Sequence, residues 1–103
     1  MINHIDLTAI KKKIELSGGV TLVLQDRLAK EDIYGQLECA RNIFLVDATS
    51  KIVWQIQTEF DSDGGSFTNI FADVGGVKGY RWDGGVYEID LKSGKAIPIL
   101  LQK

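Results

Sequence analysis

The stretch VKGYRWDGGVYEIDLKSGKAIPILL, residues 77–101, alternates strand-forming runs with turn-forming residues. The pattern predicts three antiparallel strands joined by turns at residues 83–85 and 92–94. A two-residue loop at Gly84 and Gly85 would set three cross-strand pairs: Trp82 with Tyr87, Tyr80 with Ile89, and Arg81 with Glu88. One face of this hairpin would then be aromatic and apolar, and the other would carry an ion pair.

The size and composition of the chain indicate one folded domain. A chain of 103 residues can bury one hydrophobic core but not two, so residues 1–103 are expected to form a single domain. The hydrophobic fraction of 45% and the charged fraction of 25% are typical of folded globular proteins. Eleven glycines and one proline favour a fold with many tight turns.

Further strand patterns precede residues 77–101 in the chain. Strands are expected at residues 10–16, 20–24, 42–46, 52–58 and 67–72. For residues 10–16, Leu7, Ile10 and Ile14 could instead form the apolar stripe of a helix, and the turn at residues 17–19 favours the strand. Between Gln25 and Arg41 the chain is polar, which suits an ordered loop or one short helix. We therefore expect an all-β fold of seven to eight antiparallel strands, in which Pro98 places the last strand at a sheet edge.

An internal repeat relates two parts of the chain. Residues 42–56 align with residues 85–100, with Asp47 over Asp90 and Lys51 over Lys95, at an offset of 43 to 44 residues. This offset is close to the length of a four-stranded propeller blade. Because a closed propeller needs at least about four blades, the repeat predicts a half-propeller-like arrangement or one strongly curled sheet.

The charge is unevenly distributed along the chain. The formal net charge is −2, but residues 57–90 carry seven acidic residues and two basic ones. Nucleic-acid-binding proteins show clustered Lys and Arg instead, so direct nucleic-acid binding is not expected. The single cysteine, Cys39, and the lack of a secretory signal or a long apolar stretch predict a cytoplasmic protein without a membrane segment.

The sequence offers little for catalysis or metal binding. His4 is the single histidine and lies near the terminus, so no Ser-His or Cys-His pair is expected. The run Asp61-Ser62-Asp63-Gly64-Gly65 is similar to the start of a calcium loop but lacks the later carboxylates. We expect no enzyme activity, no catalytic residues, no cofactor and no metal site, and we expect Cys39 to be a small buried residue.

Acidic turns next to aromatic residues indicate a protein-binding surface. Tyr and Trp are enriched in interface hot spots, and acidic surfaces speed association with basic partners. Seven residues form the predicted partner-binding set: Glu59, Asp61, Asp63, Asp73, Tyr80, Trp82 and Asp83. Within the hairpin we expect Tyr87, Ile89 and Trp82 in the core, and Asp83 and Tyr80 available to a partner. The alternative is that the acids serve solubility and the aromatic residues form the core.

Four motifs resemble those of a known group of proteins. The motifs are NIFLVD followed by KIVWQI, then FTNIFAD, GYRWDG and VYEIDLKSGK. They resemble small bacterial immunity proteins of polymorphic toxin systems, including contact-dependent growth inhibition. The resemblance covers residues 41–97. It implies a β-rich cytoplasmic protein without enzyme activity, a monomer that forms a heterodimer with its cognate toxin domain and covers its active site. Many such toxins are RNases or DNases, whose basic grooves an acidic surface would complement.

Two other functions fit the same sequence. VYEIDLKSGK also resembles the blades of large propellers, which would suit a β scaffold that associates with itself through the Pro98 edge or a sheet face. A small-ligand-binding or calcium-binding domain is the other alternative.

Overall fold

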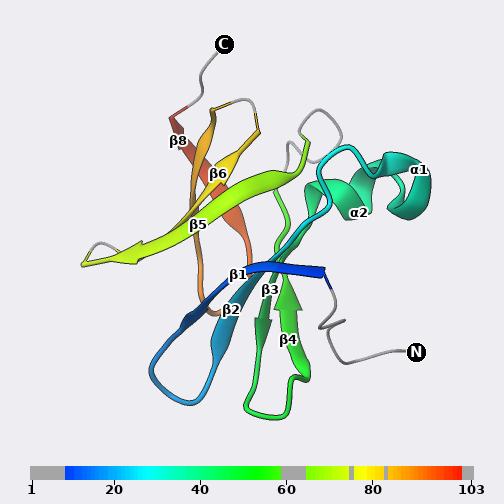
Figure 1. Ribbon diagram of the computed structural model, residues 1–103. Helices are drawn as coiled ribbons and strands as arrows, with labels where there is room; N and C mark the ends of the chain where they lie inside the picture. Colours follow the sequence, from blue (N-terminus) through cyan, green and yellow to red (C-terminus); the bar gives the residue numbers. More distant parts are fainter. Residues whose placement is uncertain (1–8, 59–64, 75, 83, 101–103) are drawn as a thin grey trace.

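The computed structural model describes residues 9–58, 65–74, 76–82 and 84–100 (Figure 1). This part of the chain forms eight strands and two short helices: β1 (Ile10–Glu15), β2 (Thr21–Gln25), α1 (Glu31–Tyr34), α2 (Gln36–Ala40), β3 (Ile43–Val46), β4 (Ile52–Gln55), β5 (Phe67–Asp73), β6 (Gly76–Arg81), β7 (Val86–Ile89) and β8 (Ala96–Leu100). The prediction of a mostly β protein is confirmed. Two short helices stand where one was expected.

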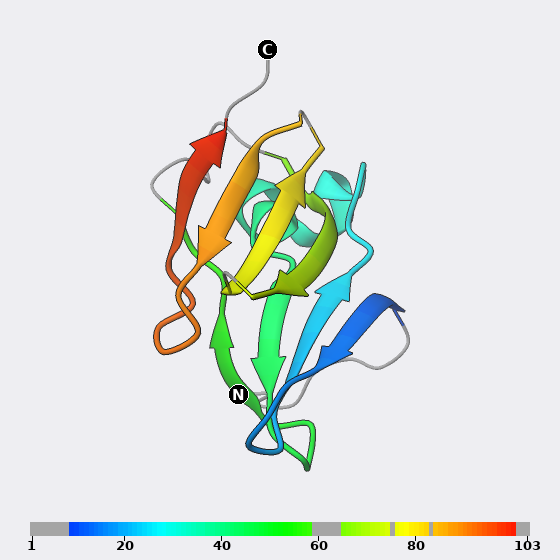
Figure 2. The same ribbon diagram turned by 90° about the vertical axis from the view of Figure 1, so that its left-hand side faces the viewer.

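The strands form two four-stranded antiparallel sheets, each in chain order. The first sheet is β1-β2-β3-β4 and the second is β5-β6-β7-β8. A parallel bridge between Gln57 and Lys95 joins the end of the first sheet to the start of β8. Figure 2 shows the outer face of the second sheet, with the helices behind it. The sheets are neither closed nor arranged like propeller blades, so the half-propeller prediction is not confirmed.

The hydrophobic core lies between the two sheets. Each sheet contributes apolar side chains from its inner face. The buried residues of this core are Leu22, Leu24, Ile43, Leu45, Trp54, Ile56, Phe67, Ile70, Val77, Tyr87, Ile89 and Ala96. The expected core positions of Tyr87 and Ile89 are therefore confirmed.

The internal repeat corresponds to equivalent hairpins in the two sheets. β3 and β4 are the last two strands of the first sheet, as β7 and β8 are of the second. Asp47 begins one turn, where its Oδ1 accepts hydrogen bonds from the backbone N–H of Thr49 and Lys51. Asp90 begins the other, where its Oδ1 accepts from the backbone N–H of Lys92. The aligned aspartates thus stabilise their turns in the same way.

The predicted register of the β6–β7 hairpin is wrong. Tyr80 lies opposite Val86, and Tyr87 lies opposite Gly79. The pairings Trp82 with Tyr87, Tyr80 with Ile89 and Arg81 with Glu88 do not occur. The reason is the loop: Arg81 N–H donates to Gly85 O at 2.8 Å, so the connection has three residues instead of two. Gly84 adopts a φ of 91°, the left-handed conformation that such three-residue loops require. Arg81 consequently points into the core instead of pairing with Glu88.

β1 contains an irregularity that the alternating pattern does not reveal. The register of β1 against β2 shifts between Ile10 and Lys12. Ile14 therefore packs on the main core, whereas Ile10 packs on a smaller cluster of Val23, Phe44 and Val46. The latter cluster lies on the opposite face of the first sheet, because Val23 alternates with its core-facing neighbours in β2. A bulge of this kind changes the face to which the following side chains point.

Two of the edge strands, β1 of the first sheet and β8 of the second, are protected in different ways. Lys12 of β1 donates from Nζ to Asn69 Oδ1 at 3.0 Å and to Ile70 O at 2.7 Å, so it ties β1 to β5. At the other edge, Ala96 N–H points away from β7 and donates to Gln57 O. Pro98 is the next residue oriented that way, and it has no N–H to offer a neighbouring chain. The predicted edge position of Pro98 is confirmed.

Candidate binding site

The helical segment formed by α1 and α2 connects β2 to β3 and is held to the first sheet by Arg27. Its guanidinium lies 4.6 Å from the centroid of the Tyr34 ring and 5.3 Å from that of Phe44. Its Nη1 forms an ion pair of 3.2 Å with Glu38 Oε2. Gly35, with a φ of 84°, ends α1 and lets the chain turn into α2. These contacts join both helices to β3 of the first sheet.

Two buried polar side chains fasten this region to the second sheet. Asn42 Nδ2 donates to Gln25 O at 2.7 Å and to Phe67 O at 2.9 Å, while Asn42 Oδ1 accepts from Phe67 N–H. Arg81, only 1% exposed, donates to Gly65 O, Tyr87 Oη and Ala40 O. Buried polar groups need such partners. The end of α2 and the start of β5 are thus set against the end of β6.

A pocket of about 490 Å³ opens at this junction. Its walls come from the helical segment, from the residues before β5 and from the β6–β7 loop: Leu28, Ala29, Glu31, Gln36, Gly65, Ser66 and Trp82. The Trp82 indole packs so closely on Gly65 that a side chain at that position would overlap with it. The backbone N–H of Trp82 donates to the backbone carbonyl oxygen of Ser66 at 3.0 Å, and this hydrogen bond joins the two walls.

Two side chains of this pocket differ from ordinary surface residues. Trp82 is 59% exposed, so the expectation that it belongs to the core is wrong. The displaced hairpin register is the cause, because β6 ends before Trp82. Its role as a partner-binding residue stays a prediction. Ser66 is 1% exposed, and its Oγ has no hydrogen-bond partner among the described residues. A buried hydroxyl without a partner costs free energy, so a ligand group that reached this oxygen would gain a hydrogen bond.

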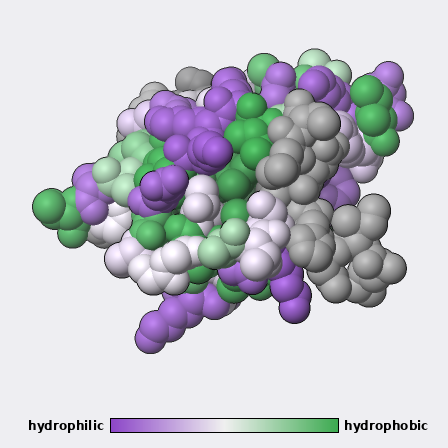
Figure 3. Space-filling model, turned by 60° about the horizontal axis from the view of Figure 1, so that its bottom comes forward, coloured by the Kyte–Doolittle hydropathy of each residue, from purple (hydrophilic) through white to green (hydrophobic). Residues whose placement is uncertain are grey.

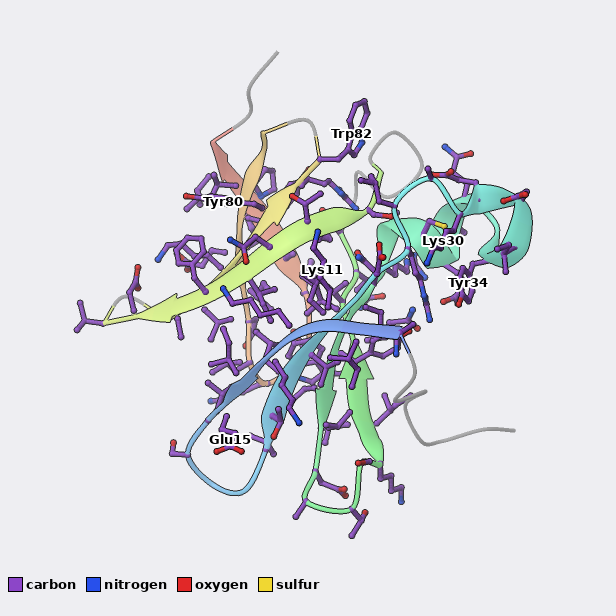
Figure 4. All side chains as sticks on the ribbon, viewed as in Figure 1. Lys11, Glu15, Lys30, Tyr34, Tyr80 and Trp82 are labelled. Atoms are coloured by element: carbon purple, nitrogen blue, oxygen red, sulfur yellow. The ribbon has the colours of Figure 1, made fainter. Side chains whose placement is uncertain are left out.

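The predicted partner-binding residues do not all lie on one surface. Tyr80 of β6 and Trp82, which directly follows that strand, point in different directions (Figure 4). Tyr80, 40% exposed, lies on the outer face of the second sheet, where its ring is 5.0 Å from that of Phe71. Asp73 is exposed and forms an ion pair of 3.2 Å with Lys78. The predicted residues Glu59, Asp61, Asp63 and Asp83 lie outside the described residues.

Several pocket residues were missed by the sequence patterns. Leu28, Glu31, Gln36 and Ser66 occur in polar stretches with no recognisable motif. Tertiary folding alone brings them next to Trp82. The one local signal is Gly65, the second of two glycines before β5, since glycine in a connection often marks close approach of another group.

One known protein family matches nearly the whole chain. A family model described as a domain of unknown function, DUF7957, matches residues 3–99. The chain belongs to the DUF7957 family. No curated protein and no solved structure matches it.

In this DUF7957 domain, the described residues contain no group of three or more His, Cys, Asp or Glu side chains that could hold a metal ion. Cys39 is buried at the end of α2 and is not in a disulfide. Burial, together with the nearby Glu31 carboxylate, raises the pKa of the Cys39 thiol above its usual range. A thiol held in its protonated form is a poor nucleophile.

Within the described part of the DUF7957 chain, neither helix is long or apolar enough to traverse a bilayer. A second hollow, of about 360 Å³, lies between the β1–β2 and β3–β4 turns. One of its polar side chains, Asp47, already accepts hydrogen bonds within its own turn. The pocket at Trp82 is therefore the better candidate for binding.

Proposed function

We propose that this protein is an immunity protein that binds and neutralises a cognate toxin domain, an RNase or DNase with a basic active site. It acts in the cytoplasm as a monomer that forms a one-to-one complex and covers the active site of the toxin. The observation that carries the proposal is Trp82, which is 59% exposed at the rim of a pocket that the acidic residue Glu31 also lines. A large aromatic side chain beside a hollow is a common anchor of protein interfaces.

Acidic residues that line the pocket or neighbour its lining residues in the sequence support a basic partner. Asp83 follows Trp82 directly, and Asp63 precedes Gly65 by two residues. Glu31 lines the pocket, and Asp32 follows it in α1. A nuclease must hold phosphates in a basic groove, and an acidic surface with an aromatic anchor complements such a groove.

The outer face of the second sheet supports a second candidate function. Ile97 and Ile99 of β8 are exposed on it beside Tyr80, and no other described element covers this face (Figure 2). This observation favours a β scaffold that associates with itself. On the face shown in Figure 3, hydrophobic side chains are separated by hydrophilic ones, so that face offers no continuous apolar surface.

The decisive experiment is a titration of the protein against the nuclease domain encoded directly upstream of its gene. We expect tight binding and loss of nuclease activity at one equivalent. Trp82→Ala should weaken the complex, and Tyr80→Ala serves as a matched aromatic control on the other surface. An absence of binding at micromolar concentrations would rule out the immunity function. A salt-independent homodimer would instead support the scaffold.

A further inference from the structure

The pocket at Trp82 has the chemistry of a site for a planar cation. We propose that it binds an arginine side chain of the partner protein. This inference rests on the proposed function, because it names the group of a basic toxin domain that the pocket recognises. The pocket has a volume of about 490 Å³, which is ample for one side chain.

The aromatic wall suits a guanidinium group. The Trp82 indole lines the pocket and is held in place by its contact with Gly65. Tryptophan is the aromatic side chain that attracts cations most strongly, and arginine stacks on aromatic faces more often than lysine does. Two arginines of the described chain already pack on aromatic rings, since Arg27 lies over Tyr34 and Arg81 lies 4.5 Å from the Phe67 ring centroid.

The local charges leave an acidic group available. Lys30 pairs with Asp26 at 3.7 Å, and Arg27 pairs with Glu38 at 3.2 Å. Glu31 lines the pocket and has no ion-pair partner within the part of the chain that the structure describes. A carboxylate beside an aromatic ring can hold a guanidinium from its edge while the ring holds its face.

Among the described residues, the buried cation Arg81 could oppose a bound arginine because it contacts Gly65 of the pocket wall. Its Nε donates to Gly65 O, and its two other guanidinium nitrogens donate to Tyr87 Oη and Ala40 O. These donors are thus used in hydrogen bonds within the protein. Glu31, on the pocket wall itself, lies where its charge acts directly on a ligand.

The buried Ser66 hydroxyl supplies a third contact. Ser66 lines the pocket, and among the residues that the structure describes its buried Oγ has no hydrogen-bond partner. An unpaired hydroxyl can accept a hydrogen bond from one of the five N–H groups of a guanidinium. Occupation of the pocket by arginine would therefore satisfy a buried polar atom that the described residues leave without a partner.

The test uses a small probe and needs no toxin. Acetyl-arginine methylamide is titrated into the isotope-labelled protein, and the two indole N–H signals are followed by NMR. We expect a saturable shift of the Trp82 signal, which Trp82→Phe assigns. The Trp54 signal should not move, because Trp54 Nε1 donates to Leu91 O and Trp54 is buried in the core.

Matched probes and variants separate the contacts. The neutral isostere acetyl-citrulline methylamide should bind at least about fivefold more weakly. Glu31→Gln should weaken arginine binding about fivefold, while Asp32→Asn, next to it in α1 but not a lining residue, should leave binding unchanged. Ser66→Ala should weaken binding about threefold. Equal binding of citrulline, tighter binding of acetyl-glutamate methylamide, or no shift up to about 50 mM probe would overturn the proposal.

The same variants keep this inference separate from the proposed function. Arginine binding without any complex with the toxin domain would support the site and refute the immunity function. A toxin complex of equal affinity for wild type, Glu31→Gln and Trp82→Phe would support the immunity function and refute the arginine site.

Discussion

Arg81 Nη1 of β6 donates a hydrogen bond of 3.1 Å to Tyr87 Oη of the neighbouring strand β7, and this bond is buried. The guanidinium also lies 5.0 Å from the centroid of the Tyr87 ring. With its bonds to Gly65 O and Ala40 O, Arg81 joins the second sheet to α2 and to the start of β5. The structural support of the Trp82 pocket thus depends on one buried cation.

Replacing Arg81 by methionine should therefore destabilise the fold strongly. The substitution keeps most of the side-chain volume but leaves two backbone carbonyls and the Tyr87 hydroxyl without this donor. We expect a loss of about 3 kcal/mol in the free energy of unfolding, measured by urea denaturation. Tyr87→Phe, which removes one hydroxyl only, should cost about 1 kcal/mol. Equal effects of the two variants would contradict this role of Arg81.

The β7–β8 turn should not accept a side chain at Gly94. Gly94 has a φ of 78°, and a Cβ there would lie 2.6 Å from Trp54 Cε3. Gly94→Ala should cost about 3 kcal/mol and displace the Trp54 indole, a change that its fluorescence would report. Gly19 has the same φ of 78° and open space around it, so Gly19→Ala isolates the backbone strain. It should cost about 1 kcal/mol, and a similar cost at both glycines would exclude the contact with Trp54 as the cause.

The β3–β4 turn should contribute to a pH dependence of stability. Hydrogen bonds from the Thr49 hydroxyl, the Thr49 N–H and the Lys51 N–H lower the pKa of Asp47 below its ordinary value of 3.8. Because the folded-state pKa is the lower one, this stabilisation is complete above about pH 4 and is lost as the pH falls through the folded-state pKa.

The comparison of wild type with Asp47→Asn isolates this effect. Wild type should be the more stable protein near pH 7, and the difference in unfolding free energy should shrink only below the ordinary pKa of 3.8. An NMR titration of the Asp47 carboxyl gives the folded-state pKa directly. A measured pKa at or above the ordinary value would show that the turn does not stabilise the carboxylate.

Reversing the acidic turn should slow binding of the toxin domain. Asp61→Lys combined with Asp63→Lys removes attraction to a basic partner, so the association rate should fall, most clearly at low salt. Glu15→Lys is the control, since Glu15 lies in β1, far from Trp82 (Figure 4). Unchanged association kinetics of the double variant would show that the turn is not at the interface.

The strands, the turns and the repeat could be predicted from local patterns. The apolar run of residues 43–46 becomes the fully buried β3, and the aligned aspartates Asp47 and Asp90 begin equivalent turns. These features depend on residues close together in the chain, whose alternation and turn chemistry act over a few positions. The pocket depends instead on residues from three separate segments, and no local pattern relates Leu28 or Gln36 to Ser66.

By itself, the sequence determined a mostly β chain with an aromatic C-terminal hairpin and an acidic middle segment. The tertiary structure alone decided which aromatic residues face solvent. A three-residue loop between Arg81 and Gly85, instead of a two-residue loop, displaces the pairing of β6 and β7. That displacement turns Arg81 into the core and leaves Trp82 beyond the last paired residue, at the rim of the pocket. Alternation along a strand sets which side chains share a face, but the register, and with it the face that is buried, depends on the loop and on packing of the two sheets.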